Sequence, residues 1–440
     1  MPPLGAGPGP AMGQRLGRHH MEHGLRLYQN QRPENASRCW RRALRLLTDT
    51  SDRFIALGYL CDAHSDCGRY GELVACGLTQ LDLATRLDSP SMRAQAYLNL
   101  ARGAEKQGDF GRTLDYCHHA LRDQAHDPCL AGHAHLVLGA AYLGLANFAK
   151  AVEYYDAALR LAGQLTDSQL QVLALIGLGQ VFAFLKDYEK SLRFHSRAHE
   201  ISKSLSCKFV RLALVHLVTP LRKLGRLAEA ADCCQEALQM SLQTNDRPSQ
   251  ARCLLALGDI YRNRNELERA HSQYEMAFSL LKEMDDRLGQ AQVLMGMAKT
   301  MTAMKRQSSV CDCKALEINN KALEISTALG NKLFMYYCHV RLEEIYGSLG
   351  DEINRLQEER LAMSLAADLD RVCGVCRQEY GDTPAPLEAL PCAHIFHAKC
   401  VREVLQERER RRKKRTCPEC RRTLGASRTF LDCDQHDSIM

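Results

Sequence analysis

Residues 138–158, LGAAYLGLANFAKAVEYYDAA, contain the pattern that decides the fold. Two stretches with small, apolar and aromatic residues at helical spacing flank a short turn at Ala146 and Asn147. Glycine and alanine let two antiparallel helices approach closely, and aromatic rings such as Phe148 and Tyr155 fill the space between them. The stretch therefore predicts a tightly packed helical hairpin.

The same turn recurs along the chain at a nearly constant interval. Each copy is a short polar turn followed by an aromatic residue or leucine, and these positions are Tyr70, Phe110, Phe148, Tyr188, Leu227 and Leu267. The steps between them are 40, 38, 40, 39 and 40 residues, a register that chance would not keep. Because single hairpins cannot bury their apolar faces alone, the repeat predicts an all-α superhelix of stacked hairpins.

The pattern resembles the tetratricopeptide family, with connections longer than that family's usual 34-residue period, and it covers residues 21–331. Two places depart from it. Pro220 should kink or end its helix, and the turn from Lys305 to Cys313 is expanded. The repeated Leu, Ala and Tyr residues are predicted to form the core, so function would lie on the concave face, which suits a peptide or an amphipathic helix.

Residues 332–370 continue in a helical pattern, with apolar residues whose spacing is only partly heptad-like. Two interpretations stay open. The segment is either a coiled coil or partner-binding helix, or a last packing helix that caps the array.

Eight Cys and His residues at metal-ligand spacing follow. The spacing is C-x2-C, x15, C-x-H-x2-H-x2-C, x16, C-x2-C, and the residues are Cys373, Cys376, Cys392, His394, His397, Cys400, Cys417 and Cys420. Eight such ligands fill two tetrahedral sites and leave no open position for a catalytic water. The sequence therefore predicts two structural Zn²⁺ ions.

This order of ligands resembles the RING family with two central histidines, in a module that we place at residues 371–422. The resemblance implies a cross-braced pairing in which Cys373, Cys376, His397 and Cys400 hold one ion, and Cys392, His394, Cys417 and Cys420 hold the other. Because the pairs interleave, so small a domain should depend on its metal for folding.

RING domains often act as ubiquitin or ubiquitin-like ligases by docking a conjugating enzyme. Val375 and Pro418 match that docking surface, and Arg421 matches the arginine that contacts the modifier. Val404 stands where a tryptophan is common. The resemblance therefore leaves two roles open, a ligase and a RING that serves only as a binding module.

Composition and charge restrict the class of protein. The 440 residues are 45% hydrophobic, enough for several folded units, and no stretch resembles a membrane span or a signal peptide, so we expect a cytoplasmic protein.

The positive charge is concentrated near the C-terminal end. Residues 401–422 hold ten Lys or Arg against four Glu, a net charge of +6 that equals that of the whole chain. This single basic stretch argues against a broad nucleic-acid-binding surface. Its run at 408–415 is either a nuclear import signal, an acidic-lipid patch or a solvated insertion.

Both ends of the chain are expected to be disordered, at residues 1–20 and 423–440. Met12-Gly13-Gln14 matches the start of a myristoylation signal, although Gly13 is internal and Gly17 stands where Ser or Thr is preferred. Acylation of Gly13 would require translation to begin at Met12.

The whole arrangement resembles a family of receptor-associated scaffold proteins of the synapse. The stretches that carry this resemblance include His23–Gln29, Tyr97–Arg102, Lys186–Lys190 and Ala389–His397. The resemblance implies a peripheral protein at the cytoplasmic face of the postsynaptic membrane that clusters nicotinic acetylcholine receptors through their cytoplasmic loops. It also implies self-association through the repeats and links to dystroglycan and the cytoskeleton. The alternative is a ubiquitin or ubiquitin-like ligase whose repeats select the substrate.

Overall fold

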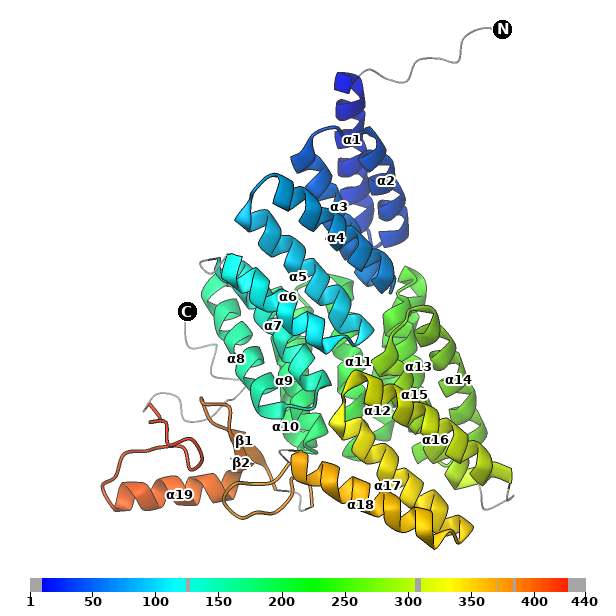
Figure 1. The fold of residues 1–440 in the computed structure, drawn as a ribbon, viewed down its shortest axis with the longest axis vertical. Helices are drawn as coiled ribbons and strands as arrows, with labels where there is room; N and C mark the ends of the chain where they lie inside the picture. The colour runs from blue at the N-terminus through cyan, green and yellow to red at the C-terminus, as the bar shows by residue number, and fades with distance from the viewer. Residues whose placement is uncertain (1–9, 124–126, 305–309, 370, 383–384, 426–440) are drawn as a thin grey trace.

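The computed structural model describes residues 10–123, 127–304, 310–369, 371–382 and 385–425. Helices α1 to α18 pair in chain order into antiparallel hairpins, and successive hairpins stack (Figure 1). This confirms the predicted all-α repeat fold. The helices are α1 (Pro10–Gln29), α2 (Pro33–Leu46), α3 (Thr50–Asp66), α4 (Tyr70–Arg86), α5 (Pro90–Gln107), α6 (Phe110–Asp123), α7 (Pro128–Gly144), α8 (Phe148–Leu165), α9 (Ser168–Phe184), α10 (Tyr188–Ser202), α11 (Cys207–Lys223), α12 (Leu227–Thr244), α13 (Arg247–Asn263), α14 (Leu267–Glu283), α15 (Arg287–Met304), α16 (Val310–Leu329), α17 (Lys332–Leu349) and α18 (Glu352–Asp368).

The recurring turns share one backbone geometry. In each, the residue two positions before the aromatic residue or leucine adopts a left-handed conformation that ends the first helix. These residues are Gly68, Gly108, Ala146, Lys186, Gly225 and Asn265, with φ between 59° and 81°. In three of the turns the next residue caps the second helix: Asp109 accepts from the Arg112 N–H at 3.0 Å, Asn147 from the Lys150 N–H at 3.1 Å and Asp187 from the Lys190 N–H at 2.9 Å.

Aromatic rings join neighbouring hairpins at the glycine positions. A Cβ atom at Gly139 or Gly177 would lie 2.7 or 2.3 Å from the Tyr155 ring. Tyr155 on α8 is 3% exposed and therefore packs directly on the backbones of both α7 and α9. The small and large residues of the sequence pattern thus meet across hairpins as well as within them.

The superhelix turns far enough for its two halves to touch on the inner side. A Cβ atom at Gly68 would lie 2.3 Å from Met284, and one at Gly108 would lie 2.3 Å from Leu329. The Lys208 ammonium group pairs with Asp66 at 2.6 Å. A crevice of about 600 Å³, lined by residues 107–111 and 327–330, remains beside these contacts. The concave face is therefore not the continuous open docking surface that the repeat pattern suggested.

The structure corrects the predicted disorder at residues 1–20. Helix α1 begins at Pro10, so residues 10–20 are helical, and residues 1–9 lie outside the described residues. The reason is tertiary packing: Gly17 fits closely against Leu47, and Gln14 donates to the Asp52 carboxylate at 2.6 Å. The low-complexity composition therefore did not predict the helix at residues 10–20.

Three further expectations can be placed in the fold. Pro220 lies in the last turn of α11, which ends at Lys223. Of the turn at residues 305–313, residues 305–309 lie outside the described residues, and α16 begins at Val310. Residues 332–368 form one more hairpin, in which α17 packs on α16 while α18 buries only Ala362 among its residues. Whether this hairpin caps the array or binds a partner stays a prediction.

The last unit is small and lies beside α10 and the end of α18 (Figure 1). Strand β1 (Leu387–Ala389) pairs with β2 (Ile395–His397) in antiparallel register, with Leu387 opposite His397. Helix α19 (Ala398–Arg410) follows directly. Two such short strands cannot form a stable sheet by themselves, so other interactions must hold this unit.

Candidate metal centre

The eight predicted ligands come together in two groups of four. Cys373, Cys376, His397 and Cys400 form one group, and Cys392, His394, Cys417 and Cys420 form the other. Within each group the potential ligand atoms all lie within 4.8 Å of one another. The grouping is the interleaved one that the RING resemblance implies. It connects β1 and β2, α19 and the two ends of the module.

Two hairpin turns with the same geometry present the paired cysteines. The Arg377 N–H donates to the Cys373 carbonyl at 2.8 Å, and the Arg421 N–H donates to the Cys417 carbonyl at 3.1 Å. Arg377 and Arg421 both adopt left-handed conformations, with φ of 63° and 59°. Each turn thereby brings its two sulfur atoms to the same side of the chain.

The histidine rings face the cysteines through one particular nitrogen. His397 Nδ1 lies 3.3 Å from Cys376 Sγ, and His394 Nδ1 lies 3.4 Å from Cys392 Sγ. The Tyr380 and His397 rings pack in a T-shaped arrangement, with 5.3 Å between ring centroids. The ligand atoms are therefore the Nδ1 atoms, a choice that ligand spacing does not reveal.

The chemistry of the donors fits zinc. A hydrogen bond from the Cys392 thiol, together with the backbone N–H groups of Cys420 and Glu419, lowers the pKa of Cys417 to about 5, against the effect of burial. The thiolate is the form that binds metal. With four Cys or His ligands in each group, the two sites fit two structural Zn²⁺ ions.

The three candidate ligase residues lie in the two C-x2-C turns. Val375 lies between Cys373 and Cys376, whereas Pro418 and Arg421 lie in the turn at Cys417 and Cys420. Val375 is 36% exposed, Pro418 is half-buried and Arg421 is exposed. The hydrogen bonds that the described part of the module makes to the helical array come instead from Leu387 and Glu388. Docking on the array therefore uses residues other than the candidates.

The basic run at residues 408–415 is exposed over most of its length. Helix α19 continues into it as far as Arg410, and Arg408 donates to the Thr416 hydroxyl at 2.5 Å. Arg411 pairs with Glu407 at 2.7 Å, so the run is partly neutralised by acidic residues of α19. Its role as a solvated insertion stays a prediction.

A buried polar junction fixes the RING module to the array. The Asp187 side chain caps α10 through the Lys190 N–H and also accepts from the Leu387 N–H at 2.7 Å. The Lys190 ammonium group donates to the Leu387 carbonyl at 2.9 Å and pairs with Glu388 at 2.7 Å. Lys190 is 2% exposed, and its Nζ also lies 4.8 Å from the centre of the Phe182 ring.

The sequence did not predict this junction, because a lysine at the same repeat position, Lys150, takes part in no such contact among the described residues. Lys150 occupies the same place two residues after the recurring aromatic, and its Nζ lies 4.9 Å from the Tyr142 ring centre. Lys150 is exposed, whereas the module covers Lys190. Nothing in the local sequence distinguishes the two lysines.

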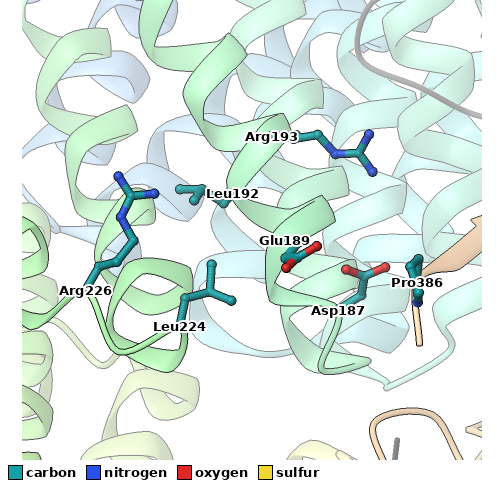
Figure 2. A pocket seen from close by; sticks show the side chains of 7 residues that line it. All are labelled: Asp187, Glu189, Leu192, Arg193, Leu224, Arg226 and Pro386. Carbon is teal, nitrogen blue, oxygen red and sulfur yellow. The ribbon is translucent and has the colours of Figure 1, made fainter. Parts of the chain in front are cut away.

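Beside the junction lies a crevice of about 510 Å³ (Figure 2). Asp187, Glu189 and Arg193 line it from α10 and the turn before it, and Leu224 and Arg226 line it from the turn between α11 and α12. Pro386 closes one end next to Asp187. Six of its seven lining residues belong to the array, and Pro386 belongs to the RING module.

The comparisons with known proteins agree with this architecture. The Rapsyn N-terminal myristoylation and linker region matches residues 12–91, tetratricopeptide repeats match 130–204 and 210–283, and a Ring finger domain matches 371–421. A Rap protein solved in complex with the competence and sporulation factor covers 80% of this chain and 98% of its own, with a TM-score of 0.57 at 12% identity, which supports the fold alone. Among the described residues, no helix is long and apolar enough to cross a membrane.

Individual relatives extend over nearly the whole chain. The 43 kDa receptor-associated protein of the synapse from Tetronarce californica is 35% identical over 419 residues, 94% of this chain and 98% of that protein. The protein of that name from Gallus gallus is 37% identical over 417 residues, 93% of this chain and 98% of its own. The E3 ubiquitin-protein ligase RNF13 from Homo sapiens is 37% identical over 67 residues, 15% of this chain and 16% of that protein. Since identity above 30% extends over almost the full length of the synaptic proteins, this chain belongs to the rapsyn family, the 43 kDa receptor-associated proteins of the synapse.

Proposed function

We propose that this protein is a peripheral scaffold that clusters nicotinic acetylcholine receptors at the cytoplasmic face of the postsynaptic membrane. The observation that carries the proposal is the likeness to two receptor-associated proteins of the synapse over 93% and 94% of this chain. That likeness includes the N-terminal region, the repeats and the RING module in one order. Self-association through the repeats would let one scaffold connect several receptors.

The test is to co-express the full chain with a nicotinic receptor in non-muscle cells and image the receptors at the surface. We expect receptors to gather in clusters that contain the scaffold, and to co-precipitate with it through their cytoplasmic loops. Co-precipitation of dystroglycan would extend the proposal to the cytoskeleton. Diffuse receptors beside folded, zinc-loaded and monomeric scaffold would contradict it.

Membrane attachment through Gly13 is part of the same proposal. The family region for myristoylation begins at Met12, and Gly13 would become N-terminal after removal of that methionine. Gly13 lies in α1 of the present chain, where an internal glycine cannot be acylated. Mass spectrometry of a chain that starts at Met12 should find a myristoyl group on Gly13, and Gly13→Ala should move the protein from the membrane to the soluble fraction.

A second candidate function is that of a ubiquitin or ubiquitin-like ligase. It is favoured by the exposure of Val375 and Arg421, which leaves both able to meet a conjugating enzyme while the module is docked. Arg421→Ala should reduce modifier transfer at least tenfold with the zinc content intact. Arg377→Ala is the matched control, because Arg377 is also exposed and has nearly the same φ in the first turn. Equal transfer by both variants, or none by the unmodified protein, would remove this candidate.

A further inference from the structure

Three cations near the root of the RING module each lie over a tyrosine ring. Lys223 Nζ is 5.9 Å from the Tyr188 ring centre and Lys299 Nζ is 5.8 Å from the Tyr337 ring centre. The Arg371 guanidinium is 5.6 Å from the Tyr336 ring centre. We call these six residues the cation–tyrosine cluster.

The cluster is contiguous although its members come from distant parts of the chain. The Tyr336 and Tyr337 rings are neighbours on α17, with centroids 5.5 Å apart. Tyr188, at the start of α10, is close enough to Tyr337 and Arg371 to interact with both electrostatically. Helices α10, α11, α15 and α17 and the first residue of the RING module therefore converge here.

The cluster has more positive than negative charge. Among the described residues, no carboxylate forms an ion pair with Lys223, Lys299 or Arg371. The nearby Asp259 is shared between Arg222 at 2.8 Å and Arg262 at 3.0 Å, so that network itself holds two guanidinium groups for one carboxylate. Of the three cations only Arg371 is buried, and a buried cation normally has a partner, because the loss of hydration is costly.

Arg371 shows the imbalance most clearly. It is 4% exposed, and its buried Nε has no hydrogen-bond partner within the part of the chain that the structure describes. The Glu379 carboxylate interacts electrostatically with Tyr337 in the same cluster. The guanidinium also lies over the face of the Tyr336 ring, a contact that favours a positive charge.

The two lysines lie closer to solvent than Arg371, since Lys299 is half-buried and Lys223 is exposed, but like charges surround them too. Burial, reinforced by the charges of Arg341 and Arg262, lowers the pKa of Lys299 to about 8. Burial and Arg222 likewise lower the pKa of Lys223. An anion bound here would oppose both effects by favouring the charged ammonium groups.

From this geometry we infer that the cation–tyrosine cluster binds a soluble, multiply charged phosphate ligand. Lysine and arginine side chains bind phosphate oxygens through charge-assisted hydrogen bonds, and the tyrosine hydroxyls can add neutral ones. A compact polyphosphate presents several negative charges close together and so matches three converging cations, whereas each carboxylate of an acidic peptide contributes one. The inference is independent of receptor clustering.

The test is titration calorimetry of the full, zinc-loaded protein with inositol hexakisphosphate, and with inorganic pyrophosphate as a smaller probe. We expect saturable 1:1 binding of inositol hexakisphosphate that weakens at least tenfold in the Lys223→Gln, Lys299→Gln double variant. The matched control is Lys413→Gln, Lys414→Gln, which removes the same charge from the exposed basic run. Its affinity should stay within twofold of the unmodified protein.

Several outcomes would overturn the inference. These are no saturable binding by the unmodified protein, an equal loss in both double variants, or tighter binding of a glutamate-rich peptide of matched charge. Folding is checked by circular dichroism and zinc content. Because the cluster variants relieve repulsion between like charges, they should fold at least as well as the unmodified chain. Arg371→Lys, which keeps the charge but loses the planar fork, should weaken binding by a smaller factor than the double variant.

Discussion

The helical array and the RING module are stabilised in different ways. In the array, neighbouring hairpins bury alanine, leucine and aromatic side chains against one another, as Tyr155 does between α7 and α9. The module has two three-residue strands and one helix, and its segments meet at two groups of metal ligands. Stability of the array is therefore spread over many contacts, whereas stability of the module is concentrated in a few atoms.

The two regions nevertheless use one backbone device. A left-handed residue ends the first helix of each hairpin whose turn the structure describes, as Ala146 does, and one follows each C-x2-C pair, at Arg377 and Arg421. In the array this residue lets the chain reverse so that apolar faces can pack. In the module it lets two sulfur atoms converge. The two regions thus share a turn geometry and differ in the groups that the turn brings together, apolar helix faces in the array and metal ligands in the module.

The largest effect should follow from loss of a zinc ligand. Cys417→Ala should unfold the module, because structural zinc contributes about 10–16 kcal/mol of apparent binding free energy in small domains. Zinc content should fall, and amide exchange should become fast in residues 371–425 while α7 and α8 keep their protection. Cys253→Ala, which removes an equally buried thiol from the array, should keep both zinc ions and cost only about 1 kcal/mol. Unchanged zinc content in Cys417→Ala would show that the comparison is wrong.

A cavity in the array should have the next largest effect. Tyr155→Ala should lower the free energy of unfolding by about 3–5 kcal/mol, because the ring fills the space above two glycines. Chemical denaturation followed by circular dichroism measures this change. Tyr155→Phe keeps the ring and should cost less than about 1.5 kcal/mol. Similar losses for both variants would mean that the hydroxyl, and not the packing of the ring, is what matters.

The junction between the two regions should be sensitive to a single lysine. Lys190→Met should weaken docking by about 3 kcal/mol, the low end of the range for breaking a buried ion pair, because Arg402 still pairs with Glu388 at 2.8 Å. Hydrogen exchange at β1 reports the undocking. Lys150→Met at the equivalent repeat position should change stability by no more than about 0.5 kcal/mol. If the two variants behave alike, the buried junction does not hold the module in place.

The smallest expected effect concerns a single turn. Asn147→Ala should destabilise the array by about 1 kcal/mol through loss of the N-cap hydrogen bond to Lys150. Thermal unfolding would detect this shift. Arg226→Ala changes the corresponding residue of a turn whose N-cap makes no side-chain hydrogen bond, so its effect should be smaller. A larger loss in Arg226→Ala would indicate that capping does not set the stability of these turns.

Much of the molecule was predictable because its rules are local. The spacing of Tyr70, Phe110 and Phe148 predicted the hairpins, since each turn and its cap involve residues only a few positions apart. The eight zinc ligands were equally visible, because metal coordination restricts both the residue type and the spacing. Local composition was misleading at residues 10–20, where contacts of α1 with Leu47 and Asp52 stabilise a helix.

By itself, then, the sequence determined the repeat, the positions of the turns and the eight zinc ligands, whose division into two groups of four is seen in the structure. Only the tertiary structure decided that Asp187 binds Leu387 200 residues away, that Lys190 is buried while Lys150 is exposed, and that Lys223, Lys299 and Arg371 converge. The physical reason is that a repeat period describes neighbours along the superhelix. Contacts across its inner side depend on the accumulated rotation of many hairpins, which no single stretch of sequence specifies.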